Sequence, residues 1–571
     1  MKYSFISRTR VIFFCISIFA LILMSKLFLV QVLQSSAYSD RADKQYSTPA
    51  SNIFERGTIY FTRKDSQLVS AATQTTGFKI AINPIKIIDK EAVYKELTKT
   101  IKLDHDEFLT KAQKENDPYE EIANHLSKVE ADAIALLKIP GISVYKEKWR
   151  FYPGANLASQ SLGFVAYKGD DLSGRYGIER QYNNELSRNK DNPYINFFAE
   201  VFSNINETLF SDKTLEGDIV TTIEPSVQGF LEKTLESVKE KYQIDSVGGI
   251  IMNPVDGSIY ALSSKPDFDL NNFSKIRTAT FSNPLVENVF EFGSVVKPLV
   301  MAGALDAKVV TANTTYDDKG SVIVENKEIF NFDKKARGVV NMQEVLNQSL
   351  NTGMVFVYKK LGREKMRDYM LSYGIKDKTG IDLPNETGGL VSNLINSPRD
   401  IEYANAAFGQ GIALTPMEIV RALASLSNGG NLVVPHIVQK IKYNNGTEKE
   451  MTYETTRVKI TEATGQEITR MLVNVMDKSL KVNGLPAKIE NYSIAVKTGT
   501  AQVANREGGG YYEDKHTHSF FGYFPAYEPK FIIFLYAINP KGVPYAAQTW
   551  AEPFLGITKF LINYYEVPPD R

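Results

Sequence analysis

Cysteine is almost absent from this chain of 571 residues, because Cys15 is its only one. A single cysteine excludes a framework of disulfide bonds within the chain, although it does not decide the compartment. Neither sign of charge is in excess, since 66 Lys and Arg residues are matched by 66 Asp and Glu residues. Balanced charge gives no reason to expect nucleic acid as a partner, and the length allows several globular domains.

Histidine is also scarce, with five in the whole chain. The one close pair is His516-Thr517-His518, and strand alternation would place both rings on the same side. No acidic residue or cysteine is spaced to complete a set of metal ligands around them. We therefore expect neither a metal nor another cofactor.

A long apolar run extends from Val11 to Leu33 and is preceded by a basic segment that carries Lys2, Arg8 and Arg10 without an acid. At about 1.5 Å per residue the run reaches roughly 34 Å, enough to cross the hydrocarbon core if Lys26 extends toward the outer interface. Because positive ends stay in the cytoplasm, residues 1–10 are predicted to be a cytoplasmic tail and residues 11–33 a transmembrane signal anchor.

The alternative for this region is a cleaved signal peptide. Its apolar part would be Val11 to Met24, and Ser35-Ser36-Ala37 would offer small residues to a peptidase. The resumption of apolar sequence beyond Lys26 favours the anchor. Both alternatives place everything that follows outside the cytoplasm.

Residues 34–215 have the pattern of a mixed α/β region. A strand is predicted near Arg56-Gly57-Thr58-Ile59-Tyr60-Phe61, and Asp89 to Lys114 and Ser127 to Leu137 have helix-like spacing of apolar and charged residues. No constellation of catalytic groups occurs in this region. We interpret it as an elongated pedestal with a structural, dimerisation or docking role.

The composition changes again at Leu215-Glu216-Gly217-Asp218, and residues 216–571 are predicted to form the second domain. An amphipathic helix is expected from Pro225 to Tyr242, and a hairpin around Pro254-Val255-Asp256-Gly257. Strands at Phe520 to Pro525 and Phe531 to Ile538 and a closing helix complete the pattern. The predicted class is α/β (α+β), an antiparallel sheet flanked by helices.

The segment from Phe290 to Pro298 contains the candidate nucleophile. A helix that starts here would put Ser294 and Lys297 on one face, one turn apart, with Pro298 in the first turn. A serine hydroxyl is a weak nucleophile until a base takes its proton, and a lysine can do so only when neutral. The pattern alone is weak, because Ser187-Arg188-Asn189-Lys190 repeats it in a polar stretch.

Two later segments strengthen Ser294. Ser349-Leu350-Asn351 is expected on a turn between two helices, and Lys497-Thr498-Gly499-Thr500 continues a strand that begins near Ser493. A second Lys-Thr-Gly, Lys378-Thr379-Gly380, has no strand leading into it and is predicted to be an ordinary surface turn. The three segments in this order form the signature of active-serine penicillin-recognising enzymes.

With these motifs the chain resembles the class B penicillin-binding proteins, the monofunctional peptidoglycan D,D-transpeptidases, and among them the septal, division-type members. The resemblance covers nearly the whole chain and includes Arg56-Gly57-x-Ile59, Tyr152-Pro153, Gly177-Ile178-Glu179 and Gly409-Gln410-Gly411. The chain departs from the family pattern at three positions that carry no reacting group: Phe61, Asn253 and Phe292.

The resemblance implies that Ser294 attacks the bond between the last two D-alanines of a stem peptide and that a neighbouring amine then takes the acyl group. Lys297 is the expected base, although the base of related enzymes is disputed. Ser349 would relay a proton toward the leaving amine, Asn351 would hold the substrate amide, and Lys497 would complete the catalytic set. β-Lactams should acylate Ser294, because their strained amide imitates the scissile bond.

The substrate's terminal carboxylate is expected on the hydroxyls of Thr498 and Thr500, with Gly499 allowing the substrate backbone to lie close to the strand. The N–H groups of Ser294 and Thr500 would form the oxyanion hole. A neutral Lys297 needs its pKa lowered from about 10.4 to about 7 or 8, which is roughly 3 to 5 kcal/mol. A second cation about 5 Å away supplies about 3 kcal/mol at an effective dielectric near 20, so Lys497 combined with burial would suffice.

The chain has no block that we interpret as a glycosyltransferase. The resemblance implies a polytopic membrane glycosyltransferase and divisome or elongation proteins as partners, met through the anchor and the pedestal. The expected location is the cell membrane, with a single pass, the N-terminus in the cytoplasm and the catalytic domain outside.

Two alternatives stay open. A D,D-carboxypeptidase or β-lactamase-like hydrolase shares the motifs but transfers the acyl group to water, and Glu344 could suggest a deacylating base, although a glutamate on a helix surface accounts for it better. A catalytically idle scaffold or β-lactam sensor would act through residues 34–215, against which the intact motifs argue.

Overall fold

The computed structural model describes residues 55–114, 117–168, 171–188, 216–482, 484–505 and 509–571, together with Phe13, Ile18, Phe19 and Leu23. Apart from those four positions, the predicted tail (1–10), the predicted anchor (11–33) and the alternative cleavage site (35–37) lie outside the described residues. Among the helices that are described, none has the length and apolar character needed to cross a membrane.

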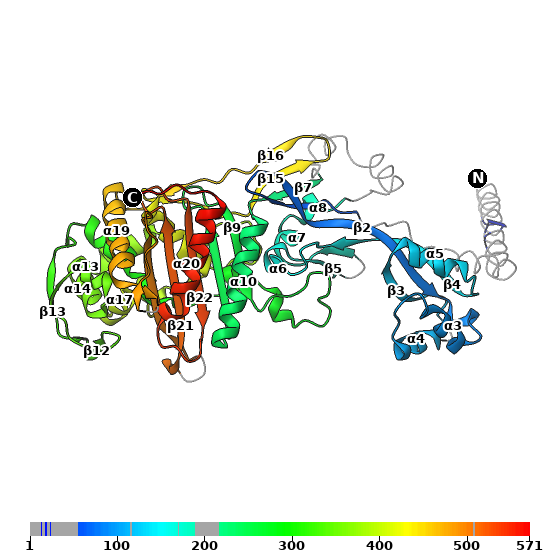
Figure 1. Cartoon of the computed structure of the whole chain (residues 1–571), viewed down its shortest axis with the longest axis horizontal. Coiled ribbons are helices and arrows are strands. Elements are labelled where there is room, and N and C mark those ends of the chain that lie inside the picture. Colours follow the sequence, from blue (N-terminus) through cyan, green and yellow to red (C-terminus); the bar gives the residue numbers. More distant parts are fainter. Residues whose placement is uncertain are drawn as a thin grey trace, which may run out of the picture. The chain divides into compact units, whose positions relative to one another are not determined.

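The chain forms two compact units, shown with their elements in Figure 1. Among the described residues, one unit contains Glu55 and Gln74–Arg150, and the other contains Arg56–Thr73 and the residues from Phe151 to Arg571. Both boundaries fall within strands, at Thr73 in β2 (Leu68–Ile82) and at Arg150 in β4 (Ile142–Phe151). No motif in the sequence marks these positions.

The first unit has a small core of its own. The later residues of β2 pair with β4 and with β3 (Glu120–Leu126), and buried residues such as Ile80, Leu97 and Phe108 pack between this sheet and the helices. Asp89, Asp104 and Ser127 accept backbone hydrogen bonds at the helix starts, as N-cap residues do. The helices predicted here are confirmed as α3 (Lys90–Leu97), α4 (His105–Ala112) and α5 (Lys128–Leu136).

The second unit contains two larger sheets. In the first, the strand order is β16 (Glu448–Glu450), β15 (Val438–Tyr443), β7 (Gly217–Thr221), β1 (Ile59–Thr62) and then the start of β2. β1 and β7 are parallel, and the other pairs within this unit are antiparallel. The same unit contains α6 (Ser159–Leu162), β5 (Val165–Lys168), β6 (Asp171–Gly174), α7 (Gly177–Gln181) and α8 (Asn183–Leu186). Of the pedestal motifs, Gly177-Ile178-Glu179 begins α7, whereas Tyr152-Pro153 directly follows β4.

The second sheet is antiparallel throughout and confirms the predicted antiparallel sheet. Its order is β20 (Ala495–Ala504), β21 (Tyr511–Phe524), β22 (Phe531–Ile538), β8 (Ser246–Met252) and β9 (Ile259–Lys265), which makes β20 an edge strand. The hairpin predicted around Pro254 is the β8–β9 pair. β21 begins at Tyr511, earlier than the predicted start at Phe520, and its additional residues pair with the end of β20.

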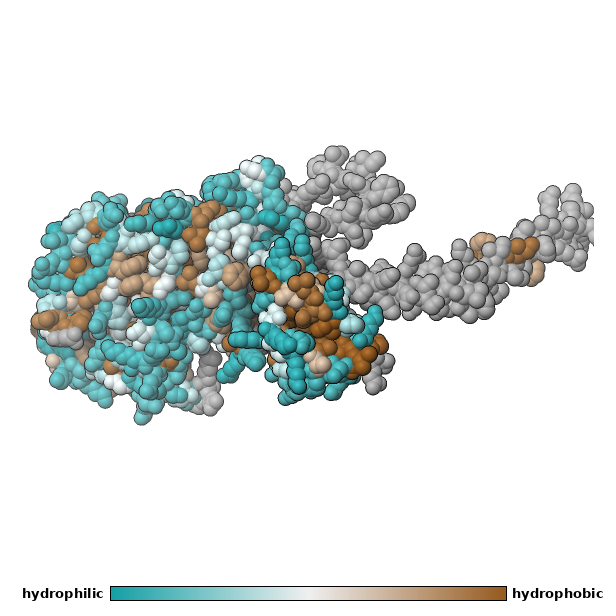
Figure 2. All heavy atoms as spheres, turned by 45° about the vertical axis from the view of Figure 1, so that its right-hand side comes forward, coloured by the Kyte–Doolittle hydropathy of each residue, from teal (hydrophilic) through white to brown (hydrophobic). Residues whose placement is uncertain are grey.

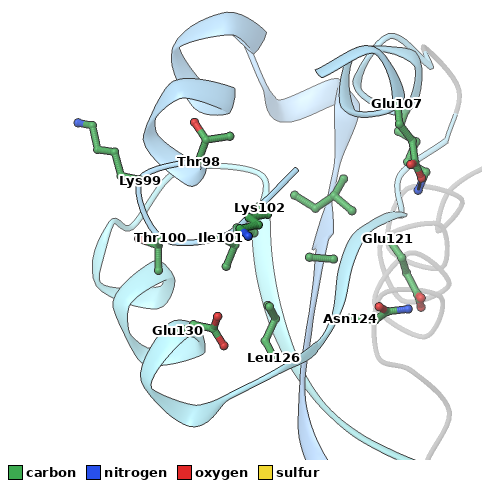
Figure 3. Close-up of a pocket in the computed structure, with 13 residues that line it drawn as sticks. Thr98, Lys99, Thr100, Ile101, Lys102, Glu107, Glu121, Asn124, Leu126 and Glu130 are labelled. Carbon is green, nitrogen blue, oxygen red and sulfur yellow. Dashed lines mark hydrogen bonds and ion pairs between the residues drawn. The ribbon is translucent and has the colours of Figure 1, made fainter. Parts of the chain in front are cut away.

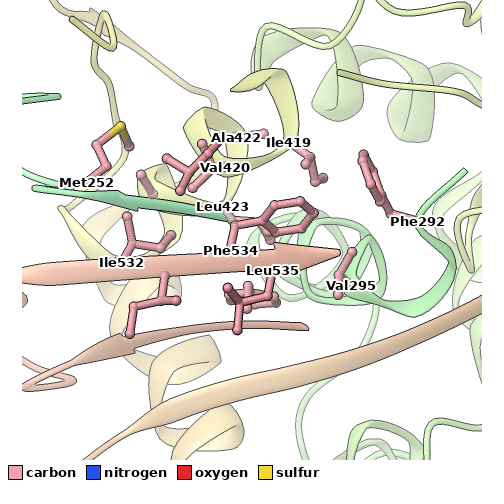
Figure 4. Packing of buried hydrophobic residues seen from close by; sticks show 14 of the residues in the cluster. Met252, Phe292, Val295, Ile419, Val420, Ala422, Leu423, Ile532, Phe534 and Leu535 are labelled. Carbon is pink, nitrogen blue, oxygen red and sulfur yellow. The ribbon is translucent and has the colours of Figure 1, made fainter. Parts of the chain in front are cut away.

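Helices cover both faces of this sheet. On one face lie α10 (Pro225–Tyr242) and α20 (Ala546–Tyr564), and Leu231 of α10 packs near Leu535 above Gly249. On the opposite side of β22, Phe534 points toward Phe292 and Leu423 of α18 (Pro416–Ser427), as Figure 4 shows. The Phe292 and Phe534 ring centroids are 5.0 Å apart. The segment before Ser294 is therefore anchored directly on the sheet.

The remaining elements of the second unit form a helical layer with short hairpins. They are α11 (Pro284–Glu287), α12 (Lys297–Asp306), α13 (Met342–Asn347), α14 (Asn351–Leu361), α15 (Arg363–Ser372), α16 (Ser392–Asn396), α17 (Asp400–Ala406), α19 (Glu462–Asn474), β10 (Thr315–Asp318), β11 (Ser321–Val324), β12 (Lys327–Phe330), β13 (Gly338–Asn341), β14 (Asn431–Leu432), β17 (Thr456–Arg457), β18 (Lys481–Val482) and β19 (Leu485–Pro486).

Candidate active site

Ser294 lies in a 3₁₀ turn, Gly293–Val295, immediately before α12, whereas the sequence predicted it within the helix. The turn starts at Gly293, whose φ of 66° is a left-handed value that glycine adopts without strain, and Gly293 N donates to Gly409 O over 3.1 Å. Lys297 is the first residue of α12, and Pro298 occupies its first turn as predicted. In the part of the chain that the structure describes, the Ser294 hydroxyl makes no hydrogen bond.

The Lys297 amine is fully buried and points at Ser349-Leu350-Asn351, the second of the three motifs. Its Nζ donates to the Ser349 carbonyl over 2.6 Å and to Asn351 Oδ1 over 2.8 Å, and it lies 3.2 Å from Ser349 Oγ. A carbonyl oxygen and an amide oxygen can only accept, so these two bonds use both N–H groups of a neutral amine. The lone pair of neutral Lys297 is then left for a hydroxyl proton.

The second motif is held on the turn between α13 and α14. Ser349 has a φ of 55°, a left-handed value that is uncommon for a residue with a side chain. Both motif residues were predicted on the turn, but Asn351 is the first residue of α14. Its Nδ2 donates to Phe330 O over 2.9 Å, which aims its Oδ1 at Lys297.

A buried polar network behind this turn was not found from the sequence. Asp318 accepts from Thr352 Oγ1 over 2.7 Å and from Asn331 Nδ2 over 2.9 Å, and Asn331 Oδ1 accepts from Thr352 N over 3.2 Å. All three side chains are buried. Because Thr352 follows Asn351 and Asn331 follows Phe330, the network ties together the two chain segments that orient Asn351.

The third motif, Lys497-Thr498-Gly499-Thr500 on β20, contacts the hydroxyl of Ser349 from the sheet. Lys497 Nζ donates to Ser349 Oγ over 2.9 Å and to the carbonyl of Thr498 over 3.1 Å. Only 1% of Lys497 is exposed. Ser349 Oγ thus lies between two buried amines, so the structure brings Lys297, Ser349 and Lys497 together.

Both amines have lowered pKa values. Burial is the largest cause for Lys297 and the charge of Lys497 adds to it, so the pKa of Lys297 lies well below its ordinary value. Burial lowers the pKa of Lys497 from 10.5 to about 7. Both shifts favour the neutral form of the amine, and for Lys297 burial and the neighbouring charge of Lys497 act in the same direction.

The other residues of the third motif lie along the edge strand β20. Thr498 and Thr500 are half-buried, and Thr500 Oγ1 accepts from Ala546 N over 3.1 Å. Gly499, which lies between them, is buried against the 3₁₀ turn Gly293–Val295 that carries Ser294, the nucleophile turn. A Cβ built on Gly499 would lie 2.2 Å from Phe292 O and 3.1 Å from Ser294 N. The backbones of Ser294 and β20 are therefore in van der Waals proximity.

The competing motif copies lie in different surroundings. Ser187 Oγ accepts a hydrogen bond from Arg56, and Lys190 lies outside the described residues. Lys378-Thr379-Gly380 has no strand leading into it, as predicted. The prediction of a surface turn is wrong for Thr379, which is buried and whose N and Oγ1 both donate to Glu386.

Two further side chains considered from the sequence have local partners. Both carboxylate oxygens of Glu344 accept from the side chains of Asn347 and Gln348 at the end of α13. His518 is fully buried and bonded through Nδ1 to Thr549 Oγ1 over 2.8 Å, and burial lowers its pKa to about 4. Within the described ranges no cluster of three or more His, Cys, Asp or Glu side chains could hold a metal ion.

The first unit contains a hollow of about 750 Å³, shown in Figure 3. Its charged lining residues are balanced in sign, and several are already paired, as Lys111 is with Glu107 over 2.6 Å and Glu121 with Lys79. None of the three motifs lines it. The hollow adds no reacting group to the chemistry of the second unit.

Comparisons with known proteins match both parts of the chain. Residues 247–556 match the family described as penicillin binding protein transpeptidase domain, and residues 53–220 match the one described as penicillin-binding protein dimerisation domain. Stage V sporulation protein D of Bacillus subtilis is 29% identical over 94% of this chain and 82% of its own length. Peptidoglycan D,D-transpeptidase FtsI of Escherichia coli is 24% identical over 79% of this chain and 73% of its own.

Solved structures have the same fold. Penicillin binding protein 2X from Streptococcus thermophilus aligns with a TM-score of 0.72 at 20% identity, over 90% of this chain and 80% of that one. Penicillin binding protein 3 from Mycobacterium tuberculosis, complexed with aztreonam, aligns with a TM-score of 0.68 at 19% identity, over 91% of this chain and 98% of that one.

Proposed function

The chain belongs to the class B penicillin-binding proteins, and we propose that it is a peptidoglycan D,D-transpeptidase that works through an acyl-enzyme on Ser294. The observation that carries the proposal is the position of Ser349 Oγ, 2.9 Å from Lys497 Nζ and 3.2 Å from Lys297 Nζ. Relatives that bear the name peptidoglycan D,D-transpeptidase support it.

In the acylation step, the Ser294 oxygen bonds to the carbonyl carbon of the penultimate D-alanine. Lys297 takes the hydroxyl proton, and the oxyanion that forms is held by the N–H groups of Ser294 and Thr500. The bond to the terminal D-alanine then breaks, and its nitrogen receives a proton from Ser349, which regains one from Lys297 or Lys497. The hydrogen bonds of Lys297 Nζ in the described structure go to Ser349 and Asn351 and not to Ser294, and catalytic hydrogen bonds often form or tighten only when substrate binds.

In the second step, the amine of a neighbouring stem peptide attacks the ester of Ser294. The amine gives up a proton through the same relay, the new amide is the cross-link, and the serine oxygen leaves and takes a proton back. Thr498 and Thr500 bind the carboxylate of the donor peptide in the first step, and Asn351 holds its amide. A β-lactam ring would acylate Ser294 in the same way but leave its amine attached, so that the ester persists.

A fluorescent penicillin tests the nucleophile. The wild-type protein should become labelled and Ser294→Ala should not, whereas Ser187→Ala, in the second Ser-x-x-Lys copy, should label like the wild type. Labelling of Ser294→Ala would remove that serine from its role. Mass spectrometry of the adduct locates the ester independently.

Product analysis separates transfer from hydrolysis. With a stem pentapeptide donor and an acceptor amine, a transpeptidase yields a cross-linked dimer and free D-alanine. Release of D-alanine with only shortened monomer would favour the carboxypeptidase or β-lactamase-like alternative, and normal wall growth with Ser294→Ala would favour the scaffold or sensor.

The proposal includes a membrane anchor and partners. We place residues 1–10 in the cytoplasm, residues 11–33 across the membrane, residues 34–215 as the pedestal and residues 216–571 as the catalytic domain. A polytopic membrane glycosyltransferase and divisome or elongation proteins would contact the anchor and pedestal. Figure 2 shows that hydrophobic residues gather at places on the surface. In the first unit, the apolar side chains of Ile85, Ile88, Leu136 and Leu137 are exposed and available for contacts with such partners.

A further inference from the structure

A buried hydroxyl joins the nucleophile turn to the sheet. Ser519 lies on β21 opposite Gly499 of β20, and its side chain has no exposed surface. Its Oγ donates to the carbonyl of Phe292 over 2.7 Å, and the carbonyl of Gly499 lies 3.4 Å from the same atom. One hydroxyl therefore contacts both the chain that leads into Ser294 and the strand that carries the third motif.

The backbone directions on β20 place Thr500 toward the nucleophile turn. The N–H and C=O groups of one strand residue point to the same side, and successive residues alternate. The carbonyl of Gly499 faces Ser519, whereas Thr500 O faces Gly293, because a Cβ built on Gly293 would meet it at 2.8 Å. The N–H of Thr500 therefore points outward from the sheet edge, on the same side as the turn that holds the N–H of Ser294.

The gap between the nucleophile turn and β20 is too narrow to hold a side chain at Gly499. A Cβ on Gly499 would lie 2.3 Å from Ser519 Oγ and 2.2 Å from Phe292 O. The separation of the two backbones is thus set by backbone contact and by the single hydrogen bond that Ser519 donates.

We propose that Ser519 is a positioning residue that fixes the distance between the N–H groups of Ser294 and Thr500. Ser519 does not itself contact the substrate, because its side chain on β21 is fully buried. The inference rests on the proposed function, because this distance matters only when an acyl oxygen is bound between the two donors. Loss of one oxyanion donor typically slows a reaction by about 10² to 10³, and misplacement should cost part of that.

The test compares the wild type, Ser519→Ala and Ser519→Cys in penicillin acylation followed by stopped flow. The dissociation constant of the complex that precedes acylation should change less than about twofold, while the first-order acylation constant of Ser519→Ala should fall about 10- to 100-fold. The infrared stretch of the acyl carbonyl should move to higher wavenumber in Ser519→Ala, because its hydrogen bonds are weaker. Ser519→Cys, which keeps a weak donor, should lie between.

Ser425→Ala is the matched control, because Ser425 is equally buried but donates to Ala422 O on α18. It should acylate like the wild type with an unchanged carbonyl stretch. Slower acylation of Ser519→Ala without a carbonyl shift, or unchanged acylation, would overturn the positioning role, and Ser519→Cys decides by the same criteria if Ser519→Ala does not fold. Absence of acylation in the wild type would instead refute the proposed function.

Discussion

Lys497 Nζ donates a 2.9 Å hydrogen bond to Ser349 Oγ across 148 positions of sequence. Because that oxygen accepts from Lys497, its own proton is free to point at the lone pair of Lys297, whose two N–H groups are occupied by Ser349 O and Asn351 Oδ1. The three side chains form a path for a proton in either direction. The path works only while Lys297 is neutral, which its burial favours.

Lys497→Met should flatten the pH dependence of stability above about pH 7. Burial lowers the pKa of Lys497 to about 7, so at higher pH the unfolded chain keeps a proton that the folded chain has lost. This group makes the free energy of unfolding rise with pH by up to about 1.4 kcal/mol per unit, until the unfolded amine also loses its proton near pH 10.5. Below about pH 7 both states hold the proton and the slope vanishes.

Chemical denaturation of both proteins at pH 6, 8 and 9.5 measures this effect. The difference in the free energy of unfolding between wild type and Lys497→Met should change in favour of the wild type as pH rises. Parallel pH profiles for the two proteins would contradict a Lys497 that is neutral in the folded state at pH 8.

Lys297→Met should remove the base while keeping an unbranched side chain that is only one atom shorter. We expect the acylation constant with penicillin to fall by about 10² to 10⁴, the range over which positioned proton transfer contributes. Lys359→Met, at an exposed position on α14, is the control and should acylate normally. Near-normal acylation of Lys297→Met would eliminate Lys297 as the base.

Gly499→Ala should block acylation by steric displacement. The new Cβ would lie 2.2 Å from Phe292 O, which forces the nucleophile turn away from β20. Gly556→Ala is the matched control, because Gly556 lies within α20 and a Cβ there meets no atom within 4 Å. It should keep full acylation and raise stability by about 0.5 to 1 kcal/mol, as alanine does within helices; equal acylation by both variants would sink the steric argument.

Arg56 and Glu179 should be strongly coupled in stability. Arg56 Nε lies 2.5 Å from Glu179 Oε2, and neither side chain is more than 1% exposed. Removing one partner of a buried pair costs about 3 to 5 kcal/mol, because the other charge stays buried. A double-mutant cycle of Arg56→Met and Glu179→Gln by thermal and chemical unfolding measures the coupling.

The exposed pair Arg470 and Glu467 provides the comparison for that cycle. Their side chains are 47% and 38% exposed, so the coupling should stay within about 0.2 to 1 kcal/mol. If the two cycles gave similar coupling energies, burial would not be what makes the Arg56 pair strong.

Asp318→Ala should lower both stability and acylation. It removes the acceptor that Thr352 Oγ1, Asn331 Nδ2 and Gly320 N share, and a buried donor that is left unsatisfied costs about 1 to 3 kcal/mol. Acylation should slow because Asn351 loses its orientation. Asp333→Ala, whose partly exposed carboxylate pairs with Arg337 on the same segment, is the control; a variant of Asp318 that is destabilised but acylates at the wild-type rate would limit the network to stability.

Much of the catalytic domain could be predicted from the sequence, because its signals are local. The hairpin around Pro254 is fixed by its turn residues, α10 by apolar periodicity and the strand leading into Lys497 by its β-branched residues. The prediction that the three motifs converge in space rested on the family resemblance. Spacing alone contains no information on which turn faces which strand.

Other features have no local signal. Ser519 and Asp318 lie in ordinary polar positions of the sequence, and only the register of β21 and the packing of the hairpins bury them. Ser294 lies outside the helix because Gly293 is held in a left-handed conformation by Gly409, which is remote in sequence. The Asn351 position differs from the prediction by the one or two residues within which helix ends are uncertain.

The left-handed backbone of Ser349 has an evolutionary consequence. Glycine would adopt this conformation with less strain, and for a residue with a Cβ it costs roughly 1 kcal/mol. Laboratory evolution for heat resistance alone should therefore favour glycine or asparagine at this position and lose the wall-building reaction with it. A serine retained there across selected populations would indicate that catalysis, rather than folding, is the property under selection.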